Sequence, residues 1–390
     1  MQTDTGCVTK CRSTEKWMDR TIHGSRPQLR KSVCMVVFAS LFTTAALGNT
    51  ALRYAYVTDP VGGGGQILAY SITPANGKLL PLVGACAVTP APNNPPIAAV
   101  VDFTGEYLYT VSNVASTVSF YQINLLTGCL VLKNVYPLAP GGLGPVAVGV
   151  TPHNGCLFVS DNISGTVDAF TINGNGTLVG VPGSPFPVGP APQGLAVDEA
   201  GGHYLYVAND VAAGTVTPMF WNPPSCQPKP ILPVPTLGGF PVGVAIDPAG
   251  QFLLVTNSGT NTLVTFPIIP GGGGALGPAN PLAGTGASPA GVATTPFGDM
   301  AWVADNAGNT VHTYLLNAAS GAPAINGLVQ PTGVKPLGVT VDWTGTYFYV
   351  VDSGAGTIHG YKPNVTTGKT PVAIGVFGAG VAPTAMAIQP

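Results

Sequence analysis

Charged side chains are scarce in this sequence, and their scarcity limits what the protein can bind. Only 8% of the 390 residues are charged, whereas about 25% is usual for a globular domain. Residues 51–390 carry seven Lys or Arg against thirteen Asp or Glu, a formal balance of −6. No basic cluster interrupts this weakly acidic body, so nucleic acid is excluded as a partner.

Residues and motifs that commonly carry catalysis are also few. The last arginine is Arg53, and Glu106 and Glu199 are the only glutamates beyond residue 15. No GxSxG, HExxH, phosphate-loop or EF-hand pattern occurs, which excludes the enzyme and binding classes that those motifs define. No stretch of about 12 residues shows a 3.6-residue period, which excludes solenoids of helical repeats.

Long hydrophobic runs are missing apart from one near the N terminus. The apolar run 33–47 follows Arg26, Arg30 and Lys31, and its fifteen residues suit an export signal better than a membrane span of about 20. We expect residues 1–50 to be a cleaved targeting segment and residues 51–390 to be one domain without a transmembrane span. The protein would then be secreted, periplasmic or at the cell surface. An uncleaved membrane anchor is the alternative.

Cysteine is sparse but suggestively distributed. Three of the seven cysteines precede residue 51, and the remaining four are Cys86, Cys129, Cys156 and Cys226. An even number in an exported protein favours disulfides. The spacing does not choose among the three pairings, and unpaired buried thiols are the alternative. No CxxC occurs, so no zinc site is predicted.

What the sequence does contain is a repeat. A strand-like segment recurs seven times: YAYVTD, YTVS, CLFVSD, YLYVAN, FLLVTN, MAWVAD and YFYVVD. The final residues of successive copies are 53, 49, 48, 48, 48 and 47 positions apart. A fixed period of this length indicates a repeat architecture.

Each repeat contains four strand-like pieces. A first strand such as 242–247 is followed by a turn with Asp at its first position and Gly at its fourth, the pattern of a type I turn. The recurring segment is the second strand, an aromatic-rich third strand follows, and an Asn-Gly or Thr-Gly turn leads to the fourth. Four antiparallel strands in about 48 residues describe a propeller blade. The fold class predicted is therefore all-β, a seven-bladed β-propeller.

The two ends of the domain predict how the ring closes. The first unit begins directly at its second strand, with Tyr54. Residues 384–388 follow Pro383, just as other first strands follow a proline, and can supply the missing strand. Closure of this kind buries two sheet edges that would otherwise be exposed.

The YLYVAN-type strands and the PxG sequences that lead the first strands resemble the YVTN-type propeller repeat and the 6-phosphogluconolactonase-like family. The resemblance covers about 53–390. It implies a seven-bladed fold, and lactone hydrolysis at the mouth of the central channel as one candidate activity. No catalytic motif of that family can be matched residue by residue.

The chain direction sorts the loops into two faces. First strands begin at the top face and second strands return to it, while the Asp-x-x-Gly and Asn-Gly turns lie on the bottom face. We predict a binding mouth at the top, with Lys335 as its cation, Lys229 as a second candidate, and a ring formed by the last residue of each second strand. That ring is Asp59, Ser112, Asp161, Asn209, Asn257, Asp305 and Asp352.

The ring has two interpretations. It could bind a neutral sugar-like ligand or, at Asp59, Asp305 and Asp352, a divalent cation. Alternatively, each side chain caps a tight turn of its own blade. His312 and His359 occupy matching third-strand positions, and we expect neighbours or solvent to satisfy them, because equivalent positions in adjacent sheets are about 10 Å apart, too far for shared metal ligation.

Two functions fit these residues. The first is a non-catalytic exported module that binds a small molecule, such as a sugar lactone or neutral carbohydrate, or a protein partner. The second is a lactone hydrolase, which needs a base for water and a donor or cation for the oxyanion. An acidic mouth would repel a phosphorylated lactone. No residue pattern indicates a redox cofactor.

Overall fold

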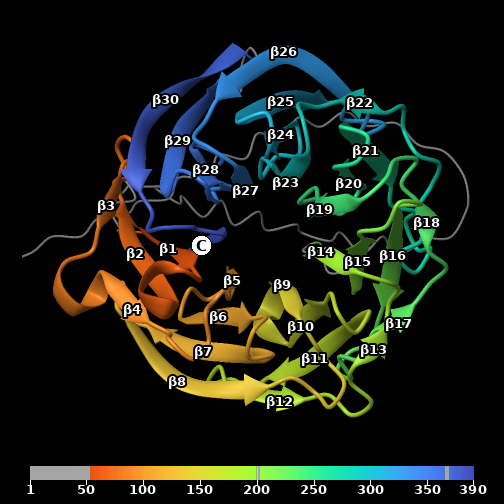
Figure 1. Cartoon of the computed structure of the whole chain (residues 1–390). Coiled ribbons are helices and arrows are strands. Elements are labelled where there is room, and N and C mark those ends of the chain that lie inside the picture. The colour runs from red at the N-terminus through yellow and green to blue at the C-terminus, as the bar shows by residue number, and fades with distance from the viewer. Residues whose placement is uncertain (1–52, 199, 201–202, 365–368) are drawn as a thin grey trace, which may run out of the picture. The chain divides into compact units, whose positions relative to one another are not determined.

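The computed structural model describes residues 53–198, 200, 203–364 and 369–390, and these form seven antiparallel sheets of four or five strands. Each first strand contacts the first strands of the two neighbouring sheets around a central channel, and the sheets radiate from it as blades (Figure 1). The predicted seven-bladed propeller is confirmed. The targeting segment predicted for residues 1–50 lies outside the described residues.

The first strands line the channel: β5 (Ala98–Val101), β9 (Pro145–Val150), β14 (Pro192–Val197), β19 (Pro241–Ile246), β23 (Pro289–Thr294), β27 (Pro336–Val341) and β31 (Ala385–Ile388). The second strands are β1 (Arg53–Asp59), β6 (Tyr107–Ser112), β10 (Cys156–Asp161), β15 (Tyr204–Asn209), β20 (Phe252–Asn257), β24 (Met300–Asp305) and β28 (Phe348–Asp352).

The third strands are β2 (Gln66–Ile72), β7 (Thr117–Ile123), β11 (Thr166–Ile172), β16 (Thr215–Phe220), β21 (Thr262–Pro267), β25 (Thr310–Leu316) and β29 (Thr357–Asn364). The outer strands are β3 (Leu79–Pro81), β4 (Val88–Pro90), β8 (Leu130–Pro137), β12 (Leu178–Gly180), β13 (Phe186–Pro187), β17 (Lys229–Pro230), β18 (Val234–Pro235), β22 (Ala283–Gly284), β26 (Pro323–Pro331) and β30 (Lys369–Gly378).

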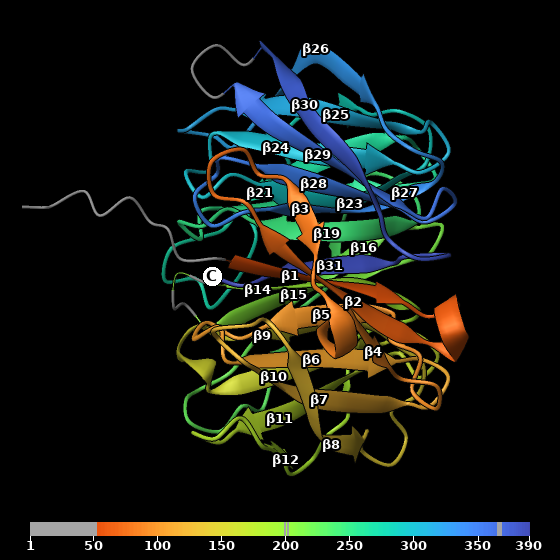
Figure 2. The same ribbon diagram turned by 90° about the vertical axis from the view of Figure 1, so that its left-hand side faces the viewer.

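Helical structure in the described residues is limited to short 3-10 turns: η1 (Gly62–Gly64), η2 (Gly84–Cys86) and η3 (Pro152–Asn154). None of these turns is long or apolar enough to cross a membrane. Viewed from the side, the strands run between the two faces, which lie on the left and right of the picture (Figure 2). The C-terminal residue is at the bottom face, on the left.

Ring closure follows the predicted scheme. Strand β31 pairs antiparallel with β1, with Val57 opposite Met386 and Ala55 opposite Ile388. The side chains of Met386 and Ile388 are buried in a core shared by blades 1 and 7. Blade 1 is therefore built from both ends of the domain.

Buried tyrosines join neighbouring blades through turn glycines. In four blades the hydroxyl of a second-strand tyrosine donates a hydrogen bond of 2.7–3.0 Å to a glycine carbonyl in the next blade. The pairs are Tyr56–Gly128, Tyr109–Gly176, Tyr206–Gly274 and Tyr349–Gly77. Each glycine has a positive φ, a backbone conformation that favours glycine. The Asn-Gly and Thr-Gly signals of the sequence thus serve the packing of blades.

Two disulfides also join neighbouring blades. Cys86 in η2 of blade 1 is bonded to Cys129 in blade 2, and Cys156 in β10 of blade 3 is bonded to Cys226 in blade 4. The pairing that the sequence left open is therefore between adjacent blades. The two bonds enclose sequence separations of 43 and 70 residues.

Deleting residues 384–390 is expected to destabilise the domain severely, because β1 loses its partner and the buried side chains of Met386 and Ile388 are removed. Thermal unfolding monitored by circular dichroism tests this. Melting as in the intact chain would contradict the closure described above.

Reducing the disulfides is expected to lower the melting temperature, because each loop of this length restricts the unfolded chain by about 4 kcal/mol. Scanning calorimetry with and without dithiothreitol measures the change. Replacing Cys156 and Cys226 by Ala should reproduce part of the loss and leave the other part sensitive to reductant. Equal melting in both conditions would show that neither bond contributes.

Candidate functional site

The ring predicted at the top mouth lies behind the loops of the top face, not in the lining of the channel. All seven side chains are at most 2% exposed. They end their strands at Asp59, Ser112, Asp161, Asn209, Asn257, Asp305 and Asp352. Their role as ligand contacts stays a prediction, whereas their contacts within the protein can be described blade by blade.

Asp59 shows what this position does for the fold. Its carboxylate accepts hydrogen bonds from the backbone N–H groups of Gly62, Val381 and Ala382 and from the Gln66 amide. Burial alone would raise the pKa of Asp59, but these bonds outweigh it and lower the pKa. The carboxylate ties the β1–β2 hairpin to the segment that leads into β31.

The uncharged members of the ring behave similarly. Asn209 Nδ2 donates to the hydroxyls of Thr215 and Thr217 at 3.0 and 2.9 Å. Asn257 Nδ2 donates to Thr262 at 3.3 Å, and Ser112 Oγ accepts from a backbone N–H of its own hairpin at 3.3 Å. These contacts support the capping interpretation for each blade.

In blades 6 and 7 the ring residue is paired with a histidine. His359 Nδ1 lies 2.6 Å from Asp352 Oδ2, and His312 Nδ1 makes the same contact with Asp305 Oδ2. Each histidine is therefore satisfied within its own blade, as expected. Among the described residues no three His, Cys, Asp or Glu side chains converge as a metal site would require, so Asp59, Asp305 and Asp352 do not form the cation site considered above.

Blade 3 differs, because the matching third-strand residue is a second acid. Asp161 and Asp168 are both fully buried, and Ser184 and Thr166 each donate to one of the two carboxyls. Burial, reinforced by the charge of Asp168 and a hydrogen bond to it, raises the pKa of Asp161 to about 9. Asp161 is therefore protonated at neutral pH, which removes the repulsion between two buried carboxylates.

The predicted cations lie apart from one another. Lys335 is exposed in the top-face loop before β27. Lys229, in β17, pairs with Phe220 at the end of β16. Phe220 in turn lies opposite Tyr204, at the start of β15. Lys229 is therefore near the bottom end of an outer strand, and its assignment to the top was wrong.

Neighbouring first strands approach each other closely near the top of the channel, where the PxG sequences lie. A Cβ atom on Gly194, Gly243 or Gly291 would stand 2.3, 2.2 or 2.6 Å from a carbonyl oxygen of the next first strand. Each of these glycines lies in a β-bulge, where glycine permits close backbone approach. The motif that marks the family resemblance thus brings neighbouring first strands together.

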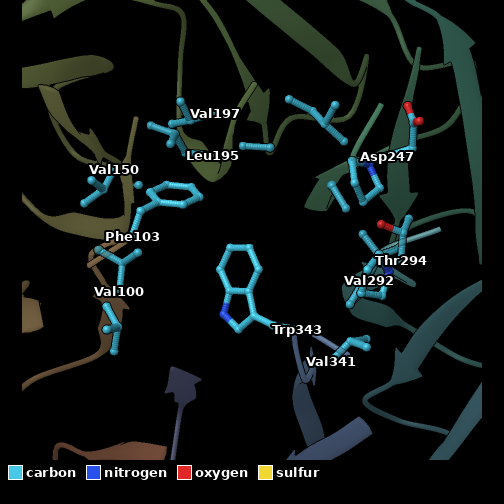
Figure 3. A pocket seen from close by; sticks show the side chains of 18 of the residues that line it. Val100, Phe103, Val150, Leu195, Val197, Asp247, Val292, Thr294, Val341 and Trp343 are labelled. Atoms are coloured by element: carbon cyan, nitrogen blue, oxygen red, sulfur yellow. The ribbon is translucent and has the colours of Figure 1, made fainter. Parts of the chain in front are cut away.

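Towards the bottom face the channel holds an apolar cavity of about 360 Å³. Its walls come from the ends of first strands in blades 2 to 7 and from the turns that follow them, as Figure 3 shows. The wall side chains are mainly aliphatic and include Val100, Val150, Leu195, Val292 and Val341. Pockets of this size and character suit small molecules.

Trp343 is the feature that distinguishes this cavity. Its indole projects into the middle of the space, facing Phe103 from across the cavity (Figure 3). The two ring centroids are 5.6 Å apart with planes at 70°, and Trp343 remains 40% exposed. An exposed indole flanked by a second aromatic ring offers a flat face to a ligand.

Sequence reasoning missed this pair, although a signal was present. Trp343 and Phe103 directly follow the Asp that opens the bottom turn, a position where blades 3, 5 and 6 have Pro152, Pro248 and Pro296. Proline is the residue that a type I turn favours there. An aromatic side chain at the same position serves no need of the turn.

The carboxylates beside the cavity are already occupied. Asp247 accepts from the backbone N–H groups of Ala249, Gln251 and Phe252. Asp342 accepts from the Tyr347 N–H at 2.8 Å and lies 3.7 Å from Arg53. Their lone pairs are directed to turn backbone and to the one arginine of the domain, which leaves little capacity to activate water.

Comparison with solved structures finds the same architecture in lactonase-like proteins. A "putative 6-phosphogluconolactonase" from Bacteroides uniformis superimposes with a TM-score of 0.75 at 20% identity, covering 87% of this chain and 99% of that one. The periplasmic gluconolactonase of Pseudomonas aeruginosa gives 0.71 at 17% identity, with the same coverage. The chain shares their fold. At this identity the likeness does not extend to activity. No family model matches the sequence, and the comparison with curated proteins finds no match.

The acid pair of blade 3 makes stability depend on pH. The folded pKa of Asp161 is about 9 instead of 3.8. The stabilising contribution of its protonated form to the free energy of unfolding is therefore complete below about pH 4 and is lost as pH rises towards 9. Asp161→Asn removes the titrating group and should flatten this fall in unfolding free energy. The fold should accept the change, since Asn occupies the same position in blades 4 and 5.

Chemical denaturation at pH 4, 7 and 9 measures the difference. Asp305→Asn is the matched control, because the partner of Asp305 is a histidine instead of an acid. Parallel pH profiles for the original protein and Asp161→Asn would contradict the raised pKa of Asp161.

Proposed function

We propose that this protein is an exported binding module that holds a small uncharged molecule in the bottom cavity of its channel. The observation that carries the proposal is Trp343, an indole kept in the open cavity at a position where blades 3, 5 and 6 have proline. A sugar lactone or neutral sugar ring has one face of C–H groups that can lie on an indole, and the aliphatic walls disfavour charged groups.

Export rests on a different observation. Both disulfides connect blades, and such bonds persist in secreted or periplasmic proteins instead of the cytosol. The apolar run at 33–47, preceded by basic residues, fits a signal for that route. Together they support a location outside the cytoplasm, where a ligand would be captured from the surroundings.

Lactone hydrolysis is the second candidate, favoured by the likeness to the periplasmic gluconolactonase. The hydrolysis of a lactone needs a base to activate water. Asp247 and Asp342 are the carboxylates that line the cavity, and the hydrogen bonds and ion pair described above occupy them. Binding without turnover is therefore the function that this site supports best.

Trp343→Ala is expected to weaken ligand binding at least about tenfold, equivalent to about 1.4 kcal/mol. Titration calorimetry of the purified protein against neutral lactones, 6-phosphogluconolactone and neutral monosaccharides provides the test. Phe297→Ala is the control, because Phe297 is an exposed aromatic in the corresponding turn of blade 6 that does not line the cavity.

Preferential binding of the phosphorylated lactone, or an equal loss in Phe297→Ala, would contradict the proposal. Hydrolysis is followed in the same samples. Turnover that disappears in Asp247→Asn while folding is retained would establish the lactonase instead.

A further inference from the structure

The top face exposes large apolar side chains all around the channel. Eight of them are between 44% and 79% exposed. They are Val61, Val114, Leu143, Ile163, Leu237, Phe240, Val334 and Val381. They come from the loops of blades 1, 2, 3, 5 and 7, and exposed alanines continue the surface over blades 4 and 6. Exposed apolar side chains gathered on one face are typical of interaction sites.

Charge is nearly absent from this face. Among the described residues of the top loops, the acids that end the second strands are buried, and only Lys335 and Asp210 carry charge at the surface. Lys335 is exposed, whereas Asp210 is partly buried and accepts a hydrogen bond from Gln193. The bottom face, in contrast, presents Lys78, Glu106 and Asp299 with Arg53.

The two surface charges have opposite signs and lie on opposite sides of the ring. Asp210 follows the second strand of blade 4, and Lys335 precedes the first strand of blade 7. Two blades separate them in one direction and three in the other. The face as a whole therefore has no net surface charge and does not repel a copy of itself.

We propose that the top face binds the top face of a second copy of this chain. A two-fold axis in the plane between the copies, bisecting the directions of Asp210 and Lys335, places each Asp210 over the partner's Lys335. The contact is thus isologous and forms two ion pairs. The apolar ring of one copy covers that of the other, which is how homodimer interfaces are built. The bottom cavity stays open.

Sedimentation equilibrium of the purified protein measures its mass in solution and so distinguishes a monomer from a dimer. The dimer is expected, and Val114→Asp is expected to raise its dissociation constant at least about tenfold by placing a charge in the apolar ring. Leu126→Asp is the matched control, because Leu126 is an 88% exposed apolar residue at the bottom of the same blade and its change should have no effect.

Charge reversal gives a second test that does not depend on the apolar ring. Asp210→Lys or Lys335→Glu alone creates two like-charge contacts and should weaken the dimer, whereas the double variant should restore it. Melting curves confirm that each variant is folded.

A monomer at all concentrations would overturn the proposal, as would a dimer sensitive to Leu126→Asp but not to Val114→Asp, or a double variant that fails to recover. Cosedimentation with phosphatidylcholine vesicles tests whether lipid, instead of a second copy, occupies the top face. A monomer that binds vesicles and loses this binding in Val114→Asp would assign the face to lipid.

Discussion

At four of the seven blade boundaries, neighbouring blades depend on the contact between a second-strand tyrosine and the turn glycine of the next blade. A Cβ at Gly77 would stand 2.5 Å from the Tyr347 ring, and one at Gly128 would stand 2.3 Å from the Tyr54 ring. The tyrosine two positions later donates to the same glycine's carbonyl. The Tyr349–Gly77 bond joins blade 7 to blade 1. Because β31 supplies the first strand of blade 1, the ring has no terminal blade.

This constraint explains why the fold could be predicted from sequence. The tyrosine–glycine bond recurs at four blade boundaries and the PxG bulge recurs in the first strands of blades 4 to 7. Features that serve the packing of blades therefore repeat along the chain, and this recurrence makes the period visible. The disulfides could not be paired because they occur once each. Cys226 lies in the loop of 221–228, and only the placement of blade 4 beside blade 3 brings it to Cys156.

The candidate site could not be predicted for the converse reason. The ring at the top face drew attention because it recurs, but recurrence reflects what each blade needs in order to fold, and the contacts of Asp59 and Asn209 are of that kind. Binding residues are needed once, so their signal is a departure from the repeat. Trp343 in place of proline is such a departure, yet its direction into the cavity depends on backbone geometry that the pattern does not contain.

The two faces meet different demands because the channel separates them. The top holds buried polar groups under an apolar surface, and the bottom gathers the aromatic pair, Arg53 and most of the exposed charge. A partner on the top face would cover the top end of the channel and leave the cavity accessible. Ligand binding and self-association would then not compete. A ligand that reached the cavity only from the top would be excluded from such a dimer, so the two proposals together require entry from the bottom.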